Sequence, residues 1–113
     1  MQILLQKISR EELNHMAAAT FGDMVKAVVD LDRELVALDA ELHSDLEALL
    51  LQDGSKQTNL WGINLYPEVS GDDFIEFDSM INVRPSSGNR SRGVQNELTR
   101  KKIVEVVRKW IHK

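Results

Sequence analysis

Apolar and polar positions follow two kinds of spacing along this chain, and the first part of it shows both. Residues 3–5 (Ile-Leu-Leu) form a short apolar run that predicts a strand. Ser9 then precedes Glu12 by three residues, which is the spacing of a capping box at a helix start. Apolar residues follow at helical intervals up to Gly22, a typical helix stop. We therefore predict a helix over residues 9–21.

The next segment is β-like. Residues 25–31 alternate apolar and more polar side chains, and a second apolar run covers residues 35–38, so we predict an antiparallel hairpin. Leucines at positions 35, 38, 42, 46 and 49 also fit helical spacing, which leaves one helix over residues 34–51 as the alternative. The valines that precede the turn favour the two strands.

Three further elements and one loop follow from the remaining pattern. Ser44 and Glu47 repeat the capping-box spacing, which predicts a helix over residues 45–52 that ends at Gly54. Residues 60–66 form an apolar strand, and residues 74–83 alternate apolar and polar side chains like a half-buried strand with Asn82 on its polar face. Residues 85–96 are a loop, after which Asn96 caps a final amphipathic helix.

The predicted order is β-α-β-β-α-β-β-α. This order indicates an α+β fold, with a small antiparallel or mixed sheet covered on one face by about three helices. The 113 residues fit one domain over residues 1–113, because two cores of half that size would each be too small.

The composition of the chain indicates its cellular location and shows that charge is unevenly distributed along the sequence. The chain has no cysteine, no apolar stretch long enough to span a membrane and no basic start typical of a signal peptide, so we expect a soluble cytoplasmic protein. The net charge of −4 conceals an acidic part, residues 1–78, and a basic part, residues 79–113. A segment of opposite charge indicates either an anionic partner or pairing with the chain's own carboxylates.

The most distinctive runs are residues 60–67 (LWGINLYP), 77–85 (FDSMINVRP) and 88–93 (GNRSRG). With these runs the chain resembles a family of small prokaryotic proteins classed as a domain of unknown function. The resemblance covers most of the chain and implies a prokaryotic, single-domain protein. It brings no activity, ligand or catalytic residue with it.

The candidate binding residues lie in the loop between the last predicted strand and the last helix. Arginine guanidiniums match the oxygens of phosphates and carboxylates, the neutral side chains add donors, and glycines allow an anion-binding nest of backbone amides. The predicted anion-binding residues are Arg84, Ser86, Asn89, Arg90, Ser91 and Arg92. We call residues 84–93 the arginine loop; the alternative is that its arginines pair with carboxylates of the same domain.

Other chemistry has weaker support. Glu41, His43 and Asp45 would share one face of an extended segment and could bind a metal, but Asp45 is more simply a residue of a helix start, so no metal site and no cofactor is predicted. A small enzyme could combine the arginine loop with Asp78 or His43.

The expected partner is a phosphate-bearing or acidic ligand. Nucleic acid is disfavoured because the chain as a whole is acidic. A homodimer that buries Trp110 and the final helix is the remaining alternative, since a domain this small gains much from added burial.

Overall fold

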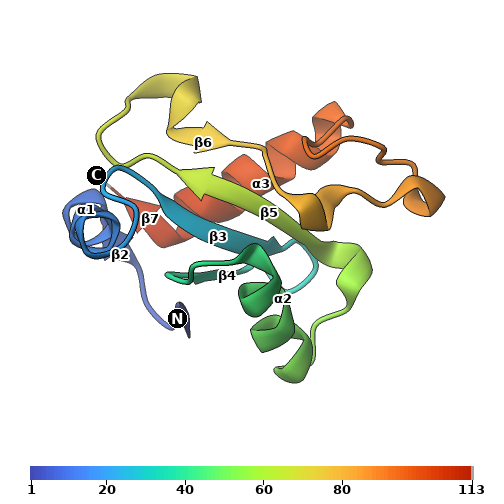
Figure 1. Cartoon of the computed structure of the whole chain (residues 1–113), viewed down its shortest axis with the longest axis horizontal. Helices are drawn as coiled ribbons and strands as arrows, with labels where there is room; N and C mark the ends of the chain where they lie inside the picture. Colours follow the sequence, from blue (N-terminus) through green and yellow to red (C-terminus); the bar gives the residue numbers. More distant parts are fainter. Residues whose placement is uncertain (113) are drawn as a thin grey trace.

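Five short strands pair into one antiparallel sheet in the computed structural model, which describes residues 1–112. Their order across the sheet is β1-β4-β3-β5-β6, so the central strands β3 and β5 carry most of the pairing (Figure 1). The strands are β1 (Gln2–Ile3), β3 (Val25–Asp30), β4 (Leu35–Leu38), β5 (Leu60–Leu65) and β6 (Ile75–Glu76). The α+β class and the predicted order of elements are confirmed, with short additions described below.

The β3–β4 hairpin is confirmed, and the alternative of one helix over residues 34–51 is wrong. The carboxylate of Asp30 explains the tight connection, because its Oδ1 accepts hydrogen bonds from the backbone amides of Asp32 and Arg33 at 2.9 and 3.0 Å. Such a side-chain turn gives the backbone a local alternative to helix. Strand pairing then starts at Asp30 and Leu35.

Three helices have local start signals of different strength. The helices are α1 (Arg10–Ala19), α2 (His43–Gln52) and α3 (Glu97–Trp110). Ser9 caps α1 by accepting from the amide of Glu12, and Asn96 caps α3 by accepting from Thr99, both as predicted. The predicted Ser44 cap is wrong, because α2 already begins at His43 and its N-cap residue Leu42 makes no side-chain hydrogen bond.

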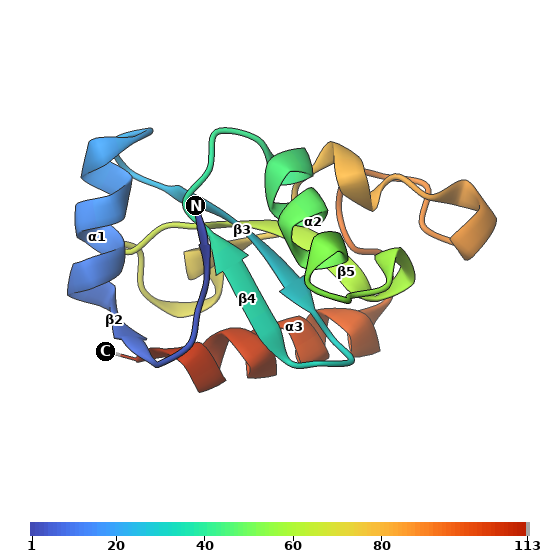
Figure 2. The same ribbon diagram turned by 90° about the horizontal axis from the view of Figure 1, so that it is seen from below.

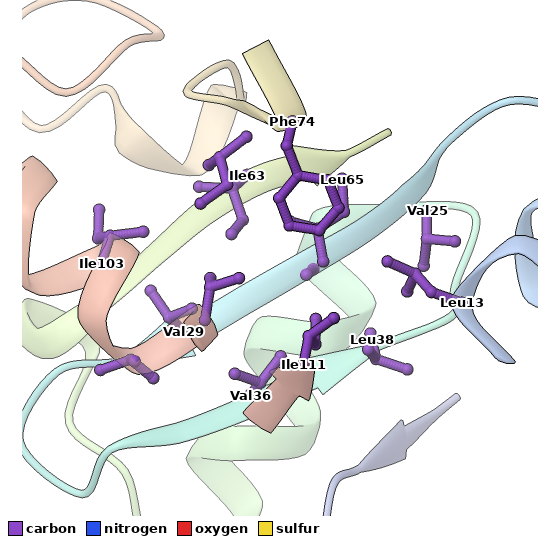
Figure 3. Packing of buried hydrophobic residues seen from close by; sticks show 14 of the residues in the cluster. Leu13, Val25, Val29, Val36, Leu38, Ile63, Leu65, Phe74, Ile103 and Ile111 are labelled. Carbon is purple, nitrogen blue, oxygen red and sulfur yellow. The ribbon is translucent and has the colours of Figure 1, made fainter. Parts of the chain in front are cut away.

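The helices lie on both faces of the sheet rather than on the single face expected from the sequence (Figure 2). Helices α1 and α3 pack on the larger core, part of which appears in Figure 3, and α2 packs on a smaller cluster on the opposite face. The α2 side is built from Val28, Ala37, Leu46, Leu50 and Leu60. Within residues 1–112, every helix is too short or too polar to cross a bilayer.

A second, two-stranded sheet joins the two ends of the chain and was not predicted. Strand β2 (Ile8–Ser9) pairs in parallel with β7 (Ile111–His112). Each strand has only two residues, too short for a periodic pattern to be recognised. Because β2 leads directly into α1 and β7 directly follows α3, this pairing sets Arg10 beside the C-terminal end of α3.

The predicted strand over residues 74–83 is wrong except at Ile75–Glu76. Residues 71–74 and 80–82 form 3₁₀ turns, and only Ile75–Glu76 pairs with β5. Asn82, expected on a polar surface, is fully buried. Its amide Nδ2 donates to the carbonyl of Gly62 at 2.9 Å, and its Oδ1 accepts from the Gly62 amide at 2.8 Å, so a side chain replaces the missing strand.

Candidate functional site

The side chain of Arg84, the first residue of the arginine loop, makes its contacts within the same chain. Its guanidinium donates to the carbonyls of Gln57 and Leu60 at 2.6 and 2.9 Å and lies over the Trp61 ring, 4.3 Å from the ring centroid. Burial lowers the pKa of Arg84 below its usual value, while the nearby charge of Glu47 opposes that shift. Arg84 therefore fastens the loop to the start of β5.

Asn89 holds the loop from within. It is almost fully buried, and its Nδ2 contacts the carbonyls of Asn82, Ser91 and Gly93 at 2.8, 3.0 and 2.8 Å. Its Oδ1 accepts from the amide of Gln95 at 2.9 Å. Two of these partners, Ser91 and Gly93, belong to the arginine loop, and Asn82 and Gln95 lie just before and just after it. Asn89 therefore satisfies backbone groups of the loop and of its two ends.

The other predicted residues differ in their surroundings. Arg92 pairs with Asp78 at 2.7 Å, and the Ser91 hydroxyl accepts from the amide of Gly93 at 3.1 Å. Ser86 and Arg90 are exposed, and neither side chain has a bonding partner among residues 1–112. The structure therefore does not bring the predicted set to one point, and anion binding by the arginine loop stays a prediction.

His43 does not lie in the extended segment that a Glu41–His43–Asp45 metal site would need, because α2 begins at His43. Its Nε2–H donates to the carbonyl of Ile63 at 2.8 Å. Burial lowers the pKa of His43, an effect partly offset by that hydrogen bond. Over the described part of the chain, no three His, Asp or Glu side chains gather as metal ligands.

The remaining alternatives also stay predictions. Asp78 is already paired with Arg92, which leaves an enzymatic role for it untested. Trp110, expected at a dimer interface, is only partly exposed, and its Nε1 donates to the carbonyl of Glu34 at 2.7 Å. It therefore has a role within one chain, whatever the oligomeric state.

A concavity with charged and apolar lining lies elsewhere, between α3 and the segment that contains β6. We call it the α3 groove; it has a volume of about 680 Å³. Its apolar floor comes from the 3₁₀ turn before β6, from β6 and its continuation, and from one side of α3 and β7. These floor residues are Phe74, Ile75, Phe77, Val104, Val107 and Ile111.

Charged side chains line the same groove. The groove is lined by the cations Arg10, Arg100, Lys101 and Arg108, by the carboxylates Asp72 and Glu105, and by His112. With His112 neutral, the formal charge of the lining is +2, in a chain whose net charge is −4. Arg100, Lys101 and Arg108 form no ion pair with any residue in positions 1–112. The alternative of pairing with the chain's own carboxylates therefore does not account for these three cations.

Only some residues of the α3 groove could have been predicted from the sequence. The basic charge of residues 79–113 pointed to α3, and Arg100, Val104 and Arg108 are spaced by four residues, which places them in one row along a helix. Nothing in the pattern linked α3 to Arg10 or Phe74, which are far away in the sequence.

The comparisons with known proteins identify a family without assigning a function. A family model described as "Protein of unknown function (DUF5674)" matches residues 2–110. No curated protein and no solved structure matches the chain. This agrees with the resemblance found in the sequence, while the prokaryotic source stays a prediction.

Proposed function

Because the chain belongs to a family of proteins of unknown function, we propose its function from its own geometry: it binds a small amphipathic anion in the α3 groove. The observation that carries this proposal is a groove whose lining combines apolar side chains with cations that have no carboxylate partner among residues 1–112. It keeps the predicted ligand class, a phosphate-bearing or acidic molecule, and moves the binding residues from the arginine loop to α3.

The apolar floor supports a ligand with an apolar body. Ligand pockets usually have about 300–1,000 Å³ and are lined mainly by apolar and aromatic side chains with a few polar groups. The α3 groove, at about 680 Å³, falls within that range. Each Å² of apolar surface that a ligand removes from water contributes about 25 cal/mol, so contact with Phe77 and Val104 favours binding.

The charges support an acidic group on the same ligand. Arg100 and Arg108 are eight residues apart, which corresponds to about 12 Å along a helix, and Lys101 lies between them in the sequence. Hydrogen bonds from cations to carboxylate or phosphate oxygens are stronger than neutral ones. A ligand that is both apolar and anionic can contact the floor with its apolar part and one of these cations with its acidic group.

The test uses 2-naphthoate and its saturated analogue decahydronaphthalene-2-carboxylate as probes, with uncharged 2-naphthamide as the control. Binding is followed by amide chemical shifts in a ¹H–¹⁵N NMR titration. We expect both acids to shift the backbone amide signals of α3 and β6. We also expect both acids to bind more tightly than 2-naphthamide. We also expect weaker binding at higher salt, because exposed charges are screened.

Two neighbouring lysines provide a matched pair of variants. Lys101 lines the α3 groove, whereas Lys102 is also exposed on α3 but does not line it. Lys101→Gln should weaken binding of both acids about tenfold through loss of a charged hydrogen bond, and Lys102→Gln should have little effect. Equal losses in the two variants, or equal binding of 2-naphthamide, would show that the groove is not an anion site.

A further inference from the structure

Arg10 lies in the α3 groove in an unusual position for a cation. It is the first residue of α1, where the helix dipole favours negative charge. Glu11 and Glu12 in the same turn match the dipole, and Arg10 opposes it. The contacts of its guanidinium come from outside α1, from Val69 and Phe74.

Those contacts hold the guanidinium of Arg10 at the groove. Its Cζ lies 3.9 Å from the centroid of the Phe74 ring, which places the cation against the face of the ring. Its Nη1 donates to the carbonyl of Val69 at 3.0 Å, which fixes the direction of the group. Phe74 itself is almost fully buried and points into the core, as Figure 3 shows. One face of the guanidinium is thus covered by a rigid aromatic ring.

The planar guanidinium has a second face on which another flat group can stack. Arginine stacks on aromatic faces through its delocalised charge, which the point charge of lysine does not reproduce. A non-planar hydrocarbon of equal size would gain the apolar contacts of the floor but not this stacking.

We infer that the ligand of the α3 groove is a planar aromatic acid and that Arg10 is the residue that selects it. This inference rests on the proposed function, because it names the ligand class of that same groove. Arg10 and Phe74 select the flat ring, while Arg100, Lys101 and Arg108 contribute the charge that attracts the acid.

The experiment compares the same two acids, which carry equal charge and differ in planarity. The wild-type chain should prefer 2-naphthoate over decahydronaphthalene-2-carboxylate by about three- to fivefold. Arg10→Lys keeps the charge and removes the planar group, so it should abolish the preference while the saturated acid still binds. Arg90→Lys is the matched control, because Arg90 is exposed outside the groove, and it should leave the preference unchanged.

A second variant tests the same inference in case Arg10→Lys does not fold. Phe74→Leu keeps an apolar side chain but removes the ring beneath the guanidinium, so it should also abolish the preference. Thermal unfolding and the ¹H–¹⁵N spectrum establish that each variant is folded. Equal wild-type binding of the two acids, or a preference that survives in a folded variant, would overturn the role of Arg10 and leave the proposed function standing. If neither acid binds the wild-type chain, both proposals fail.

Discussion

The side chain of Asn82 takes the place of a neighbouring strand beside Gly62. Two hydrogen bonds join them: Gly62 N–H to Asn82 Oδ1 at 2.8 Å, and Asn82 Nδ2 to Gly62 O at 2.9 Å. These are the bonds that a paired strand would make to that residue. Strand β6 ends after Glu76, and this pairing satisfies the outer edge of β5 beyond that point.

Replacing Asn82 should therefore be costly for stability. In Asn82→Ala the buried amide and carbonyl of Gly62 lose their partners. The carbonyl of Arg92 loses one of its two donors, Nδ2 at 2.9 Å, and keeps the amide of Ser79. We expect a loss of about 2–4 kcal/mol in the free energy of unfolding, measured by urea denaturation. Asn14→Ala, on α1, should change it by less than about 0.5 kcal/mol. Similar losses in both variants would contradict this account.

Gly62 is needed for space rather than for an unusual backbone. A Cβ on Gly62 would lie 2.6 Å from the Cβ of Ser79, so Gly62→Ala forces the two segments apart. Overpacking of this kind costs about 1–3 kcal/mol of folding free energy. Adding Ser79→Gly should restore part of that loss, because it removes the atoms that clash. A double variant whose loss equals the sum of the single losses would rule out this contact as the cause.

Arg84 and Arg90 should respond differently to the same change. Arg84→Ala removes the side-chain donor of the Leu60 carbonyl and one of the two donors of the Gln57 carbonyl, and it removes the cation from Trp61. We therefore expect a loss of about 1–3 kcal/mol in unfolding free energy. Arg90 is exposed, so Arg90→Ala should be close to neutral. Thermal unfolding of the two variants at equal salt provides the comparison. A larger loss in Arg90→Ala would reverse the assignment.

His43 should make the fold less stable in mild acid. Burial lowers the pKa of His43 from its usual 6.5, so the folded chain keeps the ring neutral where the unfolded chain already binds a proton. Stability from this source is complete above about pH 6.5 and is lost as the pH falls through the lower folded-state pKa.

The measurement is the free energy of unfolding between about pH 5 and 8, above the range where carboxylates titrate. His43→Gln can still donate to the carbonyl of Ile63 and should flatten the profile. His15→Gln, at an exposed position, should not. An unchanged slope in His43→Gln would assign the acid sensitivity to another group.

The sequence by itself determined the elements whose causes lie within a few residues. Ser9 and Asn96 each cap a helix by accepting a hydrogen bond from the backbone amide three residues later. Asp30 closes the β3–β4 turn by accepting from the backbone amide two residues later. These signals operate at fixed spacing along the backbone, so a linear pattern contains them.

The tertiary structure alone decided which distant residues meet. The alternation over residues 74–83 is real, yet Asn82 pairs with Gly62, twenty residues away, and the strand ends early. In the same way, β2 pairs with β7 and brings Arg10 beside α3, although about a hundred residues separate them. Hydrogen bonding and burial depend on neighbours in space, and the spacing of residues along the chain does not specify those neighbours.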